Sequence, residues 1–483
     1  MRRTASSAAG LSGQLIARTR WTTEQLAAHQ RDRLNSLLRQ AVAHSPYYRR
    51  VLGEDAARGQ VPLRELPTLT KSTLMEHFDE IVTDGRLRRD KVEAHLAGPS
   101  AGELLDGFRA FATAGSTGRR GAFVYSAAEF AVWMAAQVRM LHTMGVTPSM
   151  RVAAVGAPDP VHLSRQVFAA LTAALTAARA AGRAVGRAAG RSAAPDLSVT
   201  TPLPELVSAL NAYQPDAVPT YASTAAMLAE EQLASRLRIS PAIVAAGAEV
   251  LTGDMRQRIV AAWGLEPHQA YLATEAPLLA STCARQAGMH LWEDLTLVEV
   301  VDDRDQPVEP GARGHKVLIT NLVNHTQPLI RYELSDSVTL AVGTNPTGMP
   351  FRRLAAVDGR SDDAITLPAT DGTTVTVHPL RLRAPFGAFP DVIQYQVAYD
   401  GKTLTVRLVL RDGSSADIPG QIHSALTRAL QAAGATPPPI TTLRVPAIDR
   451  EPGPAGKYKL VKLAHPAVQL ATGPFPVWPG GKK

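Results

Sequence analysis

The sequence predicts an α/β protein of at least two domains, and three observations support this fold class. The chain has 483 residues, which exceeds what one hydrophobic core usually serves. Its middle part alternates short Val- and Ala-rich runs with longer segments of helical periodicity, which is typical of parallel βα units. After about residue 295 the pattern becomes rich in strands, so we expect a region of different architecture there.

The first elements of the chain are predicted from spacing and turn residues. Apolar residues recur at helical spacing over residues 22–39, and Pro46 ends this helix. Loops at the carboxyl ends of parallel strands commonly bind ligands, so we expect the site to lie there. The predicted strands of the middle region are 151–157, 216–221 and 243–246, and its predicted helices are 127–144, 223–237 and 252–263.

The C-terminal part is predicted to hold several strands and one helix. The helix covers residues 421–433 and ends before three consecutive prolines. The predicted strands are 295–301, 316–321, 337–342, 373–377 and 395–410. Within the middle region, between the predicted strands at 151–157 and 216–221, residues 179–191 repeat Arg-Ala-Ala-Gly almost unchanged. We interpret this segment as a solvated surface insertion, and docking to a carrier protein or a polyanion stays open as its alternative.

Composition excludes several classes of protein. Hydrophobic residues make up 45% and charged residues 19%, which excludes a globally disordered chain. The net charge of +8 is mild, and aromatic residues do not interleave with basic clusters, so we expect no binding to nucleic acid. The most apolar stretch, residues 167–194, contains four arginines and is not expected to span a membrane. One cysteine, Cys283, favours a reducing, cytoplasmic compartment.

The first candidate for chemistry is the loop of residues 113–121, which reads Thr-Ala-Gly-Ser-Thr-Gly-Arg-Arg-Gly. Its glycines allow backbone N–H groups to converge on an anion, and the hydroxyls of Ser116 and Thr117 add donors beside Gly118. The loop lacks Walker spacing, and an ordinary turn is the alternative.

Two further segments carry side chains suited to a nucleotide. Tyr271 can stack on a base, the Thr274 hydroxyl can bond phosphate, and the Glu275 carboxylate can hold Mg²⁺. The segment Arg331 to Asp336 offers a carboxylate of the kind that binds a ribose diol, and a surface ion pair is its alternative.

Three features near the ends of elements complete the set. Gly359 to Asp363 suits a hinge between domains, with a simple turn as the alternative. Lys457 follows a glycine in a Pro/Gly-rich stretch, where its charge could reach a reacting phosphate, although a solvent-facing lysine is the commoner case. Tyr221 ends a predicted strand. Its side chain either lines an acyl pocket or takes part in ordinary core packing.

These segments, in this order, resemble the adenylate-forming ligase superfamily, and specifically its phenylacetate-CoA ligase and coenzyme F390 synthetase-like group. The motifs His-Ser-Pro-Tyr-Tyr-Arg at 44–49 and Leu-Pro-Thr-Leu-Thr-Lys at 66–71 resemble its N-terminal signatures, and the resemblance runs from about Trp21 to Lys462. It implies an adenylate-forming enzyme fold, with a large N-terminal α/β domain over 1–361 and a small mobile C-terminal α+β domain over 362–483. The 179–191 insertion lies in the first domain.

The resemblance also implies a role for each matching residue. Ser116, Thr117 and Gly118 would bind the phosphates of ATP, and the adenine pocket would contain Gly247, Ala248 and Glu249. Tyr271 would stack on adenine, Thr274 would bind the α-phosphate, and Glu275 would bind Mg²⁺. Asp336 would bind the ribose, with Arg331 in the same motif. Asp362 corresponds to the hinge residue, with Arg360 beside it, and Lys457 to the lysine that promotes adenylation.

The implied function is ATP-dependent activation of a carboxylic acid, aromatic by resemblance, as acyl-AMP with release of pyrophosphate, followed by transfer to the thiol of CoA. The alternative keeps the adenylation but changes the acceptor or substrate, to a carrier-protein thiol, an amine, or nitrite for diazotisation of an aryl amine in natural-product biosynthesis. A non-catalytic nucleotide-binding protein is a further alternative.

The sequence departs from this family in two places. Ala114 and the pair Arg119-Arg120 replace residues common in the phosphate loop. Some relatives bind zinc through several cysteines and histidines, whereas only Cys283 and His290 stand in that region here, so we expect no zinc and a buried, inert thiol. Both a monomer and a homodimer stay open.

Overall fold

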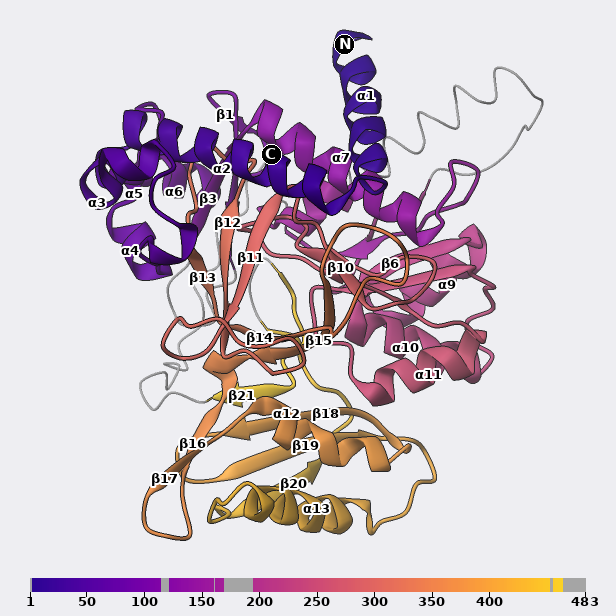
Figure 1. The fold of residues 1–483 in the computed structure, drawn as a ribbon. Coiled ribbons are helices and arrows are strands. Elements are labelled where there is room, and N and C mark those ends of the chain that lie inside the picture. Colours follow the sequence, from indigo (N-terminus) through magenta and orange to yellow (C-terminus); the bar gives the residue numbers. More distant parts are fainter. Residues whose placement is uncertain (1, 114–120, 160, 169–193, 452–454, 464–483) are drawn as a thin grey trace, which may run out of the picture. The chain divides into compact units, whose positions relative to one another are not determined.

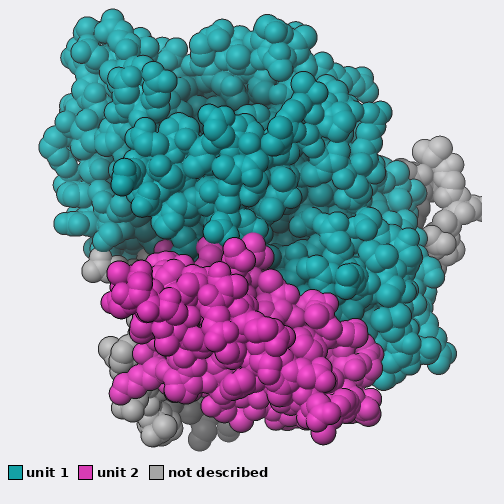
Figure 2. Space-filling view, turned by 60° about the horizontal axis from the view of Figure 1, so that its bottom comes forward, with its two compact units in different colours: residues 1–361, 450–458 teal, residues 362–449, 459–483 magenta. Residues whose placement is uncertain are grey.

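The computed structural model describes residues 2–113, 121–159, 161–168, 194–451 and 455–463. The chain divides into two compact units, coloured separately in Figure 2. The first comprises Met1–Ser361 together with Arg450–Tyr458, and the second comprises Asp362–Asp449 with Lys459–Lys483. The segment that carries Lys457 therefore belongs to the first unit, although it follows most of the second in the sequence.

The N-terminal part of the first unit is helical. The helix predicted over residues 22–39 is confirmed but is longer, because a capping box between Thr22 and Gln25 starts it and it continues to His44. The five other α-helices described in this part were not predicted, because they are short or carry little apolar periodicity. The helices are α1 (Arg2–Arg18), α2 (Thr23–His44), α3 (Pro46–Ala57), α4 (Lys71–Glu76), α5 (Phe78–Ile81) and α6 (Arg89–Ala97), with a 3₁₀ turn at Leu63–Glu65.

A three-stranded antiparallel sheet precedes the long helix α7 (Ala127–Met144). The bounds of α7 equal the predicted ones because both ends carry clear signals. Ser126 and Glu129 form a capping box, and Gly145 ends the helix in the left-handed conformation at φ 97°. The strands of this sheet are β1 (Leu104–Leu105), β2 (Phe108–Ala112) and β3 (Ala122–Ser126).

A seven-stranded sheet forms the centre of the first unit, in the order β14-β15-β10-β9-β8-β7-β6. Only β6, β7 and β8 pair in parallel, so the predicted parallel arrangement holds for this edge and the sheet as a whole is mixed. The strands are β6 (Ala217–Tyr221), β7 (Ile243–Gly247), β8 (His268–Tyr271), β9 (Ala280–Ser281), β10 (Met289–Leu291), β14 (Asp336–Leu340) and β15 (Arg353–Arg360).

Helices α9 (Leu203–Tyr213), α10 (Ala222–Leu233) and α11 (Gly253–Trp263) gather beside the parallel edge (Figure 1). Helix α10 packs on β6 and β7, and α11 packs on α10. The predicted helix over 223–237 ends four residues early, at Leu233. The strand predicted over 151–157 is reduced to β4 (Val155–Gly156), which pairs with β5 (Leu197–Ser198).

A separate antiparallel sheet of the first unit contains β11 (Thr296–Val301), β12 (Lys316–Asn321) and β13 (Tyr332–Leu334). The predicted strands at 295–301 and 316–321 are confirmed within one residue. The side chains of β12 from Val317 onwards are buried without alternation, and they include the polar residues Thr320 and Asn321.

The second unit has its own core, in which a four-stranded sheet packs against α13 (Ile418–Ala432). Ile418, Ile422, Leu426 and Leu430 form the buried face of this helix at a spacing of four residues. The run predicted as one strand over 395–410 is two strands, because Asp400 accepts N–H groups of Lys402 and Thr403 and closes a turn. The other elements are β16 (Ile365–Pro368), β17 (Thr374–Val377), α12 (Pro379–Arg383), β18 (Val392–Tyr399), β19 (Leu404–Leu410), β20 (Ile440–Arg444) and β21 (Val461–Leu463), with 3₁₀ turns at Ser361–Asp363 and Ala384–Ala388.

A buried ion pair joins the N-terminal helix to the core of the first unit. Asp294 Oδ2 accepts from Arg139 Nη1 at 2.8 Å and from Arg18 Nη1 at 3.1 Å. The side chains of Arg139 and Asp294 have no exposed surface. Burial alone would raise the pKa of Asp294, but the two arginines outweigh it and lower the pKa. The Arg139 guanidinium also lies 4.1 Å from the ring centroid of Trp292.

We expect Asp294→Ala to lower the free energy of unfolding by about 3 kcal/mol, because it leaves the buried Arg139 without its carboxylate. Urea denaturation followed by tryptophan fluorescence measures this change. Glu266→Ala is the matched control, since Glu266 pairs with Arg256 at 2.9 Å on the exposed surface, and it should change the free energy by less than about 0.5 kcal/mol. Equal losses in the two variants would contradict the importance of the buried pair.

Candidate functional site

Several of the predicted site residues lie at the carboxyl ends of three parallel strands of the central sheet. Tyr221 is the last residue of β6, Gly247 the last of β7 and Tyr271 the last of β8. The register aligns these ends, because Tyr221 pairs with Gly247 and Gly247 pairs with Ala270. The segments that follow the strands, including Glu249 and Glu275, therefore start from the same edge, as expected for ligand-binding loops of an α/β protein.

Tyr271 and Asp336 are in direct contact although they lie far apart in the sequence. The Tyr271 hydroxyl donates to Asp336 Oδ2 at 2.8 Å. Asp336, the first residue of β14, pairs with Arg360, the last of β15, and Arg360 Nε lies 3.7 Å from Asp336 Oδ1. Burial and then the Asp336 carboxylate raise the pKa of the Tyr271 phenol, so this hydroxyl stays protonated and acts as the donor.

The loop after β8 fixes a buried carboxylate. Glu275 is 7% exposed, and its Oε1 lies 3.5 Å from the Tyr332 hydroxyl. Its backbone carbonyl accepts from Asn321, and the carbonyl of Thr274 accepts from the Tyr125 hydroxyl at 2.6 Å. Burial raises the pKa of Glu275, Lys71 and Arg360 act in the opposite direction, and Asp336 adds to the rise. The free energy of the ionised form would therefore fall if a cation approached.

Lys457 contributes a further positive charge at this site, in addition to that of Arg360. Its side chain is partly buried. Burial and then the charge of Arg360 lower its pKa below the ordinary value of 10.5, while the carboxylates of Asp336, Glu249 and Glu275 partly offset that decrease. One lysine from residues 450–458 thus interacts with carboxylates from three separate parts of the first unit.

A histidine near Lys457 is held in its neutral form. His162 is 8% exposed, and its Nδ1 lies 2.8 Å from Ser164 Oγ. Burial and then the charge of Lys457 lower the pKa of His162 to about 3. Lys457, Arg360 and Lys71 are cations that act on the carboxylates here, whereas His162 adds no charge near neutral pH.

Glu249 has protein partners for both of its carboxylate oxygens. Oε1 accepts from the Tyr458 N–H at 2.6 Å, and Oε2 accepts from the Ser223 N–H at 3.0 Å. Arg450 Nη1 lies 3.5 Å from Oε1. The structure thus gives this side chain contacts to the segment that carries Lys457, in addition to its place in the Gly247-Ala248-Glu249 motif.

Two other predicted residues have partners that suggest structural roles. The Arg331 guanidinium binds Glu299 at 3.1 Å and the Leu66 carbonyl at 2.5 Å, and it is 4% exposed. Arg331 therefore connects the N-terminal region to β11. The arginine that lies beside Asp336 is Arg360 rather than Arg331. The Tyr221 hydroxyl donates to the Ala455 carbonyl at 2.9 Å.

The predicted phosphate loop falls partly outside the described residues. Ser116, Thr117 and Gly118 are among those not described, as is the 179–191 insertion. The described ends of the loop are joined, because the Thr113 N–H donates to the Gly121 carbonyl and the Gly121 N–H donates to Thr113 Oγ1. Asp362, the predicted hinge residue, is the first residue of the second unit.

Sequence reasoning missed several residues that shape the site. The charge of Lys71 lowers the pKa of Glu275. The Cε atom of Lys71 lies 2.9 Å from the position that a Cβ atom on Gly121 would occupy. The sequence did offer a signal for Lys71, because this lysine is the last residue of the family-like motif at 66–71. Tyr332 lies inside the predicted segment Arg331 to Asp336 but was given no role of its own. Tyr125 and Arg450 gave no signal, because buried tyrosines and single arginines are common in any core or surface.

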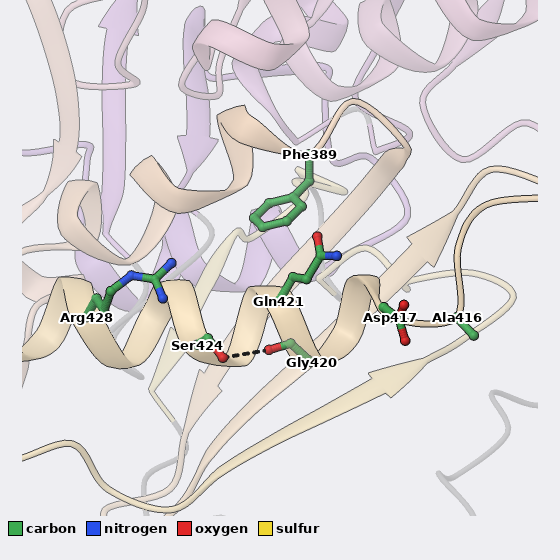
Figure 3. Close-up of a pocket in the computed structure, with 7 residues that line it drawn as sticks. All are labelled: Phe389, Ala416, Asp417, Gly420, Gln421, Ser424 and Arg428. Carbon is green, nitrogen blue, oxygen red and sulfur yellow. Dashed lines mark hydrogen bonds between the residues drawn. The ribbon is translucent and has the colours of Figure 1, made fainter.

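The pocket in the second unit contains none of the predicted site residues. It is a surface hollow of about 600 Å³ along α13 (Figure 3). Its lining comprises Phe389, Ala416, Asp417, Gly420, Gln421, Ser424 and Arg428.

Among the described residues, no group of three His, Cys, Asp or Glu side chains could hold a metal ion. His290 contacts Asn345 and Thr347, and Cys283 is buried. Within the same residues, no helix has the length and apolar character needed to cross a membrane.

Comparison with known proteins gives a consistent set of relatives, although no protein-family model matches the chain. A phenylacetate-coenzyme A ligase of Thermus thermophilus is 25% identical over 387 residues, which cover 77% of this chain and 78% of that protein. The phenylacetate-coenzyme A ligase of Escherichia coli is 30% identical over 177 residues, or 35% of this chain and 38% of that protein.

A solved structure shows the same fold. The crystal structure of 2-hydroxyisobutyryl-CoA ligase in the postadenylation state, in complex with R3-HIB-AMP, superposes with a TM-score of 0.67 at 20% identity and covers 92% of this chain and 90% of that one. The predicted α/β fold class and the family resemblance are confirmed by these matches. The chain is therefore a homologue of the phenylacetate-coenzyme A ligases, with the fold of the adenylate-forming acyl-CoA ligases.

Proposed function

We propose that the chain is an ATP-dependent, AMP-forming acid–thiol ligase, which activates a carboxylic acid as acyl-AMP and transfers the acyl group to the thiol of CoA. One observation carries this proposal. Lys457 interacts electrostatically with Asp336, Glu275 and Arg360, and Asp336 in turn accepts from Tyr271. Charged groups that are far apart in the sequence thus act on one another in a fold shared with proteins named CoA ligases.

In the first half-reaction, a carboxylate oxygen of the acid attacks the α-phosphorus of ATP. The bond from this phosphorus to the β-phosphate oxygen breaks, and pyrophosphate leaves. Negative charge grows on the phosphoryl oxygens and on the leaving group. Lys457 and Arg360 are two cations of the described site that can offset this charge, and placing them beforehand lowers the cost of reorganisation in the transition state.

The nucleotide is proposed to bind at the ends of β8 and β14. Tyr271 would stack on adenine, the ribose hydroxyls would bond Asp336, and the Thr274 hydroxyl would donate to the α-phosphate. The contact between Tyr271 and Asp336 supports this assignment, because it holds the base-binding and ribose-binding side chains side by side. Ser116, Thr117 and Gly118 are proposed to bind the outer phosphates.

Mg²⁺ is the metal that the fold family implies, and the Glu275 carboxylate fits it. Oxygen donors suit this ion, and burial disfavours the ionised carboxylate unless a cation is near. We propose that Glu275 would hold Mg²⁺ together with phosphate oxygens of ATP. When bound, the ion would neutralise part of the phosphate charge. The hydrogen bonds of Tyr125 and Asn321 to the backbone of residues 274–275 keep the carboxylate in place.

In the second half-reaction, the thiolate of CoA attacks the acyl carbon of acyl-AMP. The bond between this carbon and the phosphate oxygen breaks, and AMP leaves. We propose Asp362, with Arg360 beside it, as the hinge residue for the change between the two half-reactions. The start of the second compact unit at Asp362 supports this proposal. The single cysteine fits a reducing, cytoplasmic compartment.

A screen of pyrophosphate release tests the activity and identifies the acid. Aryl acids, aliphatic acids, amino acids and nitrite are each incubated with ATP, Mg²⁺ and the protein. Substrates that release pyrophosphate are then given CoA, a carrier-protein thiol or an amine as separate acceptors. An aryl acid with CoA is the expected pair. Binding of ATP without pyrophosphate release from any substrate would contradict the proposed function.

Lys457→Ala is expected to reduce the rate of pyrophosphate release by about 10²- to 10³-fold, because it removes one preorganised charge from the transition state. The Kd for ATP should change much less. Stopped-flow or steady-state pyrophosphate assays and equilibrium binding measure the two quantities. Lys402→Ala, which removes an exposed lysine of the second unit, is the control and should keep the parental rate. Parental activity in Lys457→Ala would show that the assignment is wrong.

The pH dependence of kcat/KM for ATP should report the ionisation of Lys457 in the free enzyme. Burial lowers the pKa of this lysine, and the lysine acts as a cation. Activity should therefore be full below its pKa and fall as the pH rises through it, at a pH below 10.5. Lys457→Arg should keep its charge to higher pH and lose this alkaline decrease. An unchanged alkaline decrease in the arginine variant would assign the ionisation to another group.

A further inference from the structure

The segment that carries Lys457 is fixed to the first unit by hydrogen bonds on both sides of the lysine. On its C-terminal side, the Tyr458 N–H donates to Glu249 Oε1 at 2.6 Å. On its N-terminal side, the Ala455 carbonyl accepts from the Tyr221 hydroxyl at 2.9 Å. The backbone on each side of Lys457 is thus held by a side chain at the carboxyl end of the parallel strands.

Arg450 closes this arrangement from within the same segment. Its Nη2 donates to Thr224 Oγ1 at 2.8 Å, and its Nη1 donates to the Gly456 carbonyl at 3.2 Å and lies 3.5 Å from Glu249 Oε1. The side chains of Arg450 and Glu249 are 15% and 7% exposed. A charge pair with so little solvent contact is stronger than an exposed one, and breaking it leaves an unpaired buried charge.

The backbone at Gly456 shows how closely the segment approaches the first unit. Gly456 has a φ of +56°, and a Cβ there would stand 3.2 Å from Val199 Cγ2 and 3.3 Å from Pro158 Cδ. A side chain at this position would be strained and crowded. Lys457 therefore follows a close approach of backbone to the body of the unit, and its position depends on the bonds on both sides.

The position of Glu249 is also fixed by contacts outside the segment that carries Lys457. Ala248 has a φ of +62°, and the Glu249 N–H donates to the Gly247 carbonyl at 2.7 Å, so a tight turn directs the chain at the end of β7. The Ser223 N–H, near the start of α10, holds the second carboxylate oxygen at 3.0 Å. The first oxygen accepts from Tyr458.

We infer that Glu249 is a positioning residue for Lys457, which it fixes through the Tyr458 N–H and Arg450, with Tyr221 as a second anchor through Ala455. This inference rests on the proposed function of the site. It differs from the role in the adenine pocket that the resemblance implies for Glu249, and from the role in the acyl pocket predicted for Tyr221. Burial raises the pKa of Tyr221 to about 12, which keeps its hydroxyl protonated and able to donate.

The inference predicts that the two half-reactions respond differently. Lys457 is needed while charge grows on the phosphates of ATP, so loss of its anchors should slow the formation of acyl-AMP. Transfer of the acyl group from acyl-AMP to CoA releases no pyrophosphate and should not depend on these anchors. A defect of folding would reduce both half-reactions in the same proportion.

Glu249→Gln is the principal variant, because glutamine keeps the size of the side chain and removes its charge. We expect kcat for pyrophosphate release to fall about 10- to 100-fold, the range expected for a lost hydrogen bond to a charged group. The KM for ATP and the rate of thioester formation from supplied acyl-AMP should stay within about twofold of the parent. Glu266→Gln, at the exposed pair with Arg256, is the matched control and should not affect any of these quantities.

Two further variants test the same contacts. Tyr221→Phe should reduce kcat for pyrophosphate release, with Tyr213→Phe, on α9, as its control. Arg450→Gln should resemble Glu249→Gln, and the double variant should lose little more than either single variant, because both remove the same charge pair.

Several outcomes would overturn the inference. The first is an unchanged kcat in Glu249→Gln. The second is a raised KM for ATP with an unchanged kcat, which would indicate that Glu249 contacts the nucleotide. The third is an equal decrease in the rates of both half-reactions. The parent protein separates these outcomes from failure of the proposed function. If the parent releases no pyrophosphate with any acid in the screen, the ligase proposal fails, whereas an active parent with an unaffected Glu249→Gln variant overturns only the positioning role.

Discussion

The site depends on the electrostatic balance around one partly buried lysine. Removing Lys457 from water disfavours its ammonium form, and Arg360 disfavours it further, so carboxylates must lie near enough to compensate. Asp336, Glu249 and Glu275 supply this negative charge from the start of β14, the end of β7 and the loop after β8. The segment that carries this lysine is held to the first unit by the hydrogen bonds of Glu249 and Tyr221.

The three carboxylates differ in how many protein partners they have, and this difference suggests a division of roles. Both oxygens of Glu249 accept N–H groups of the protein, so its contacts are those of an anchor. The Glu275 carboxylate lies 3.5 Å from the Tyr332 hydroxyl and accepts a hydrogen bond from its own backbone N–H, and burial raises its pKa. A buried carboxylate with spare oxygen capacity is suited to a cation, whereas a saturated one is suited to holding structure.

Regular elements were predicted where local signals act alone. Helix α7 has a capping box at Ser126 and a left-handed glycine at its end, and its bounds were predicted to the residue. The mixed central sheet was not predicted, because pairing direction depends on partners far away in the sequence. The run at 395–410 was predicted as one strand, since the turn at Asp400 interrupts the alternation only briefly.

The sequence by itself determined the resemblance to the phenylacetate-CoA ligases, the α/β class and the order of Tyr271, Glu275, Asp336 and Lys457, because residue types and their spacing survive without coordinates. Only the tertiary structure decided which side chains meet. It brought the Tyr271 hydroxyl to Asp336, moved Arg331 to Glu299 and the Leu66 carbonyl, and turned Glu249 towards the Lys457 segment. These contacts join residues between 32 and 265 positions apart, and no local pattern in a sequence specifies a pairing at that separation.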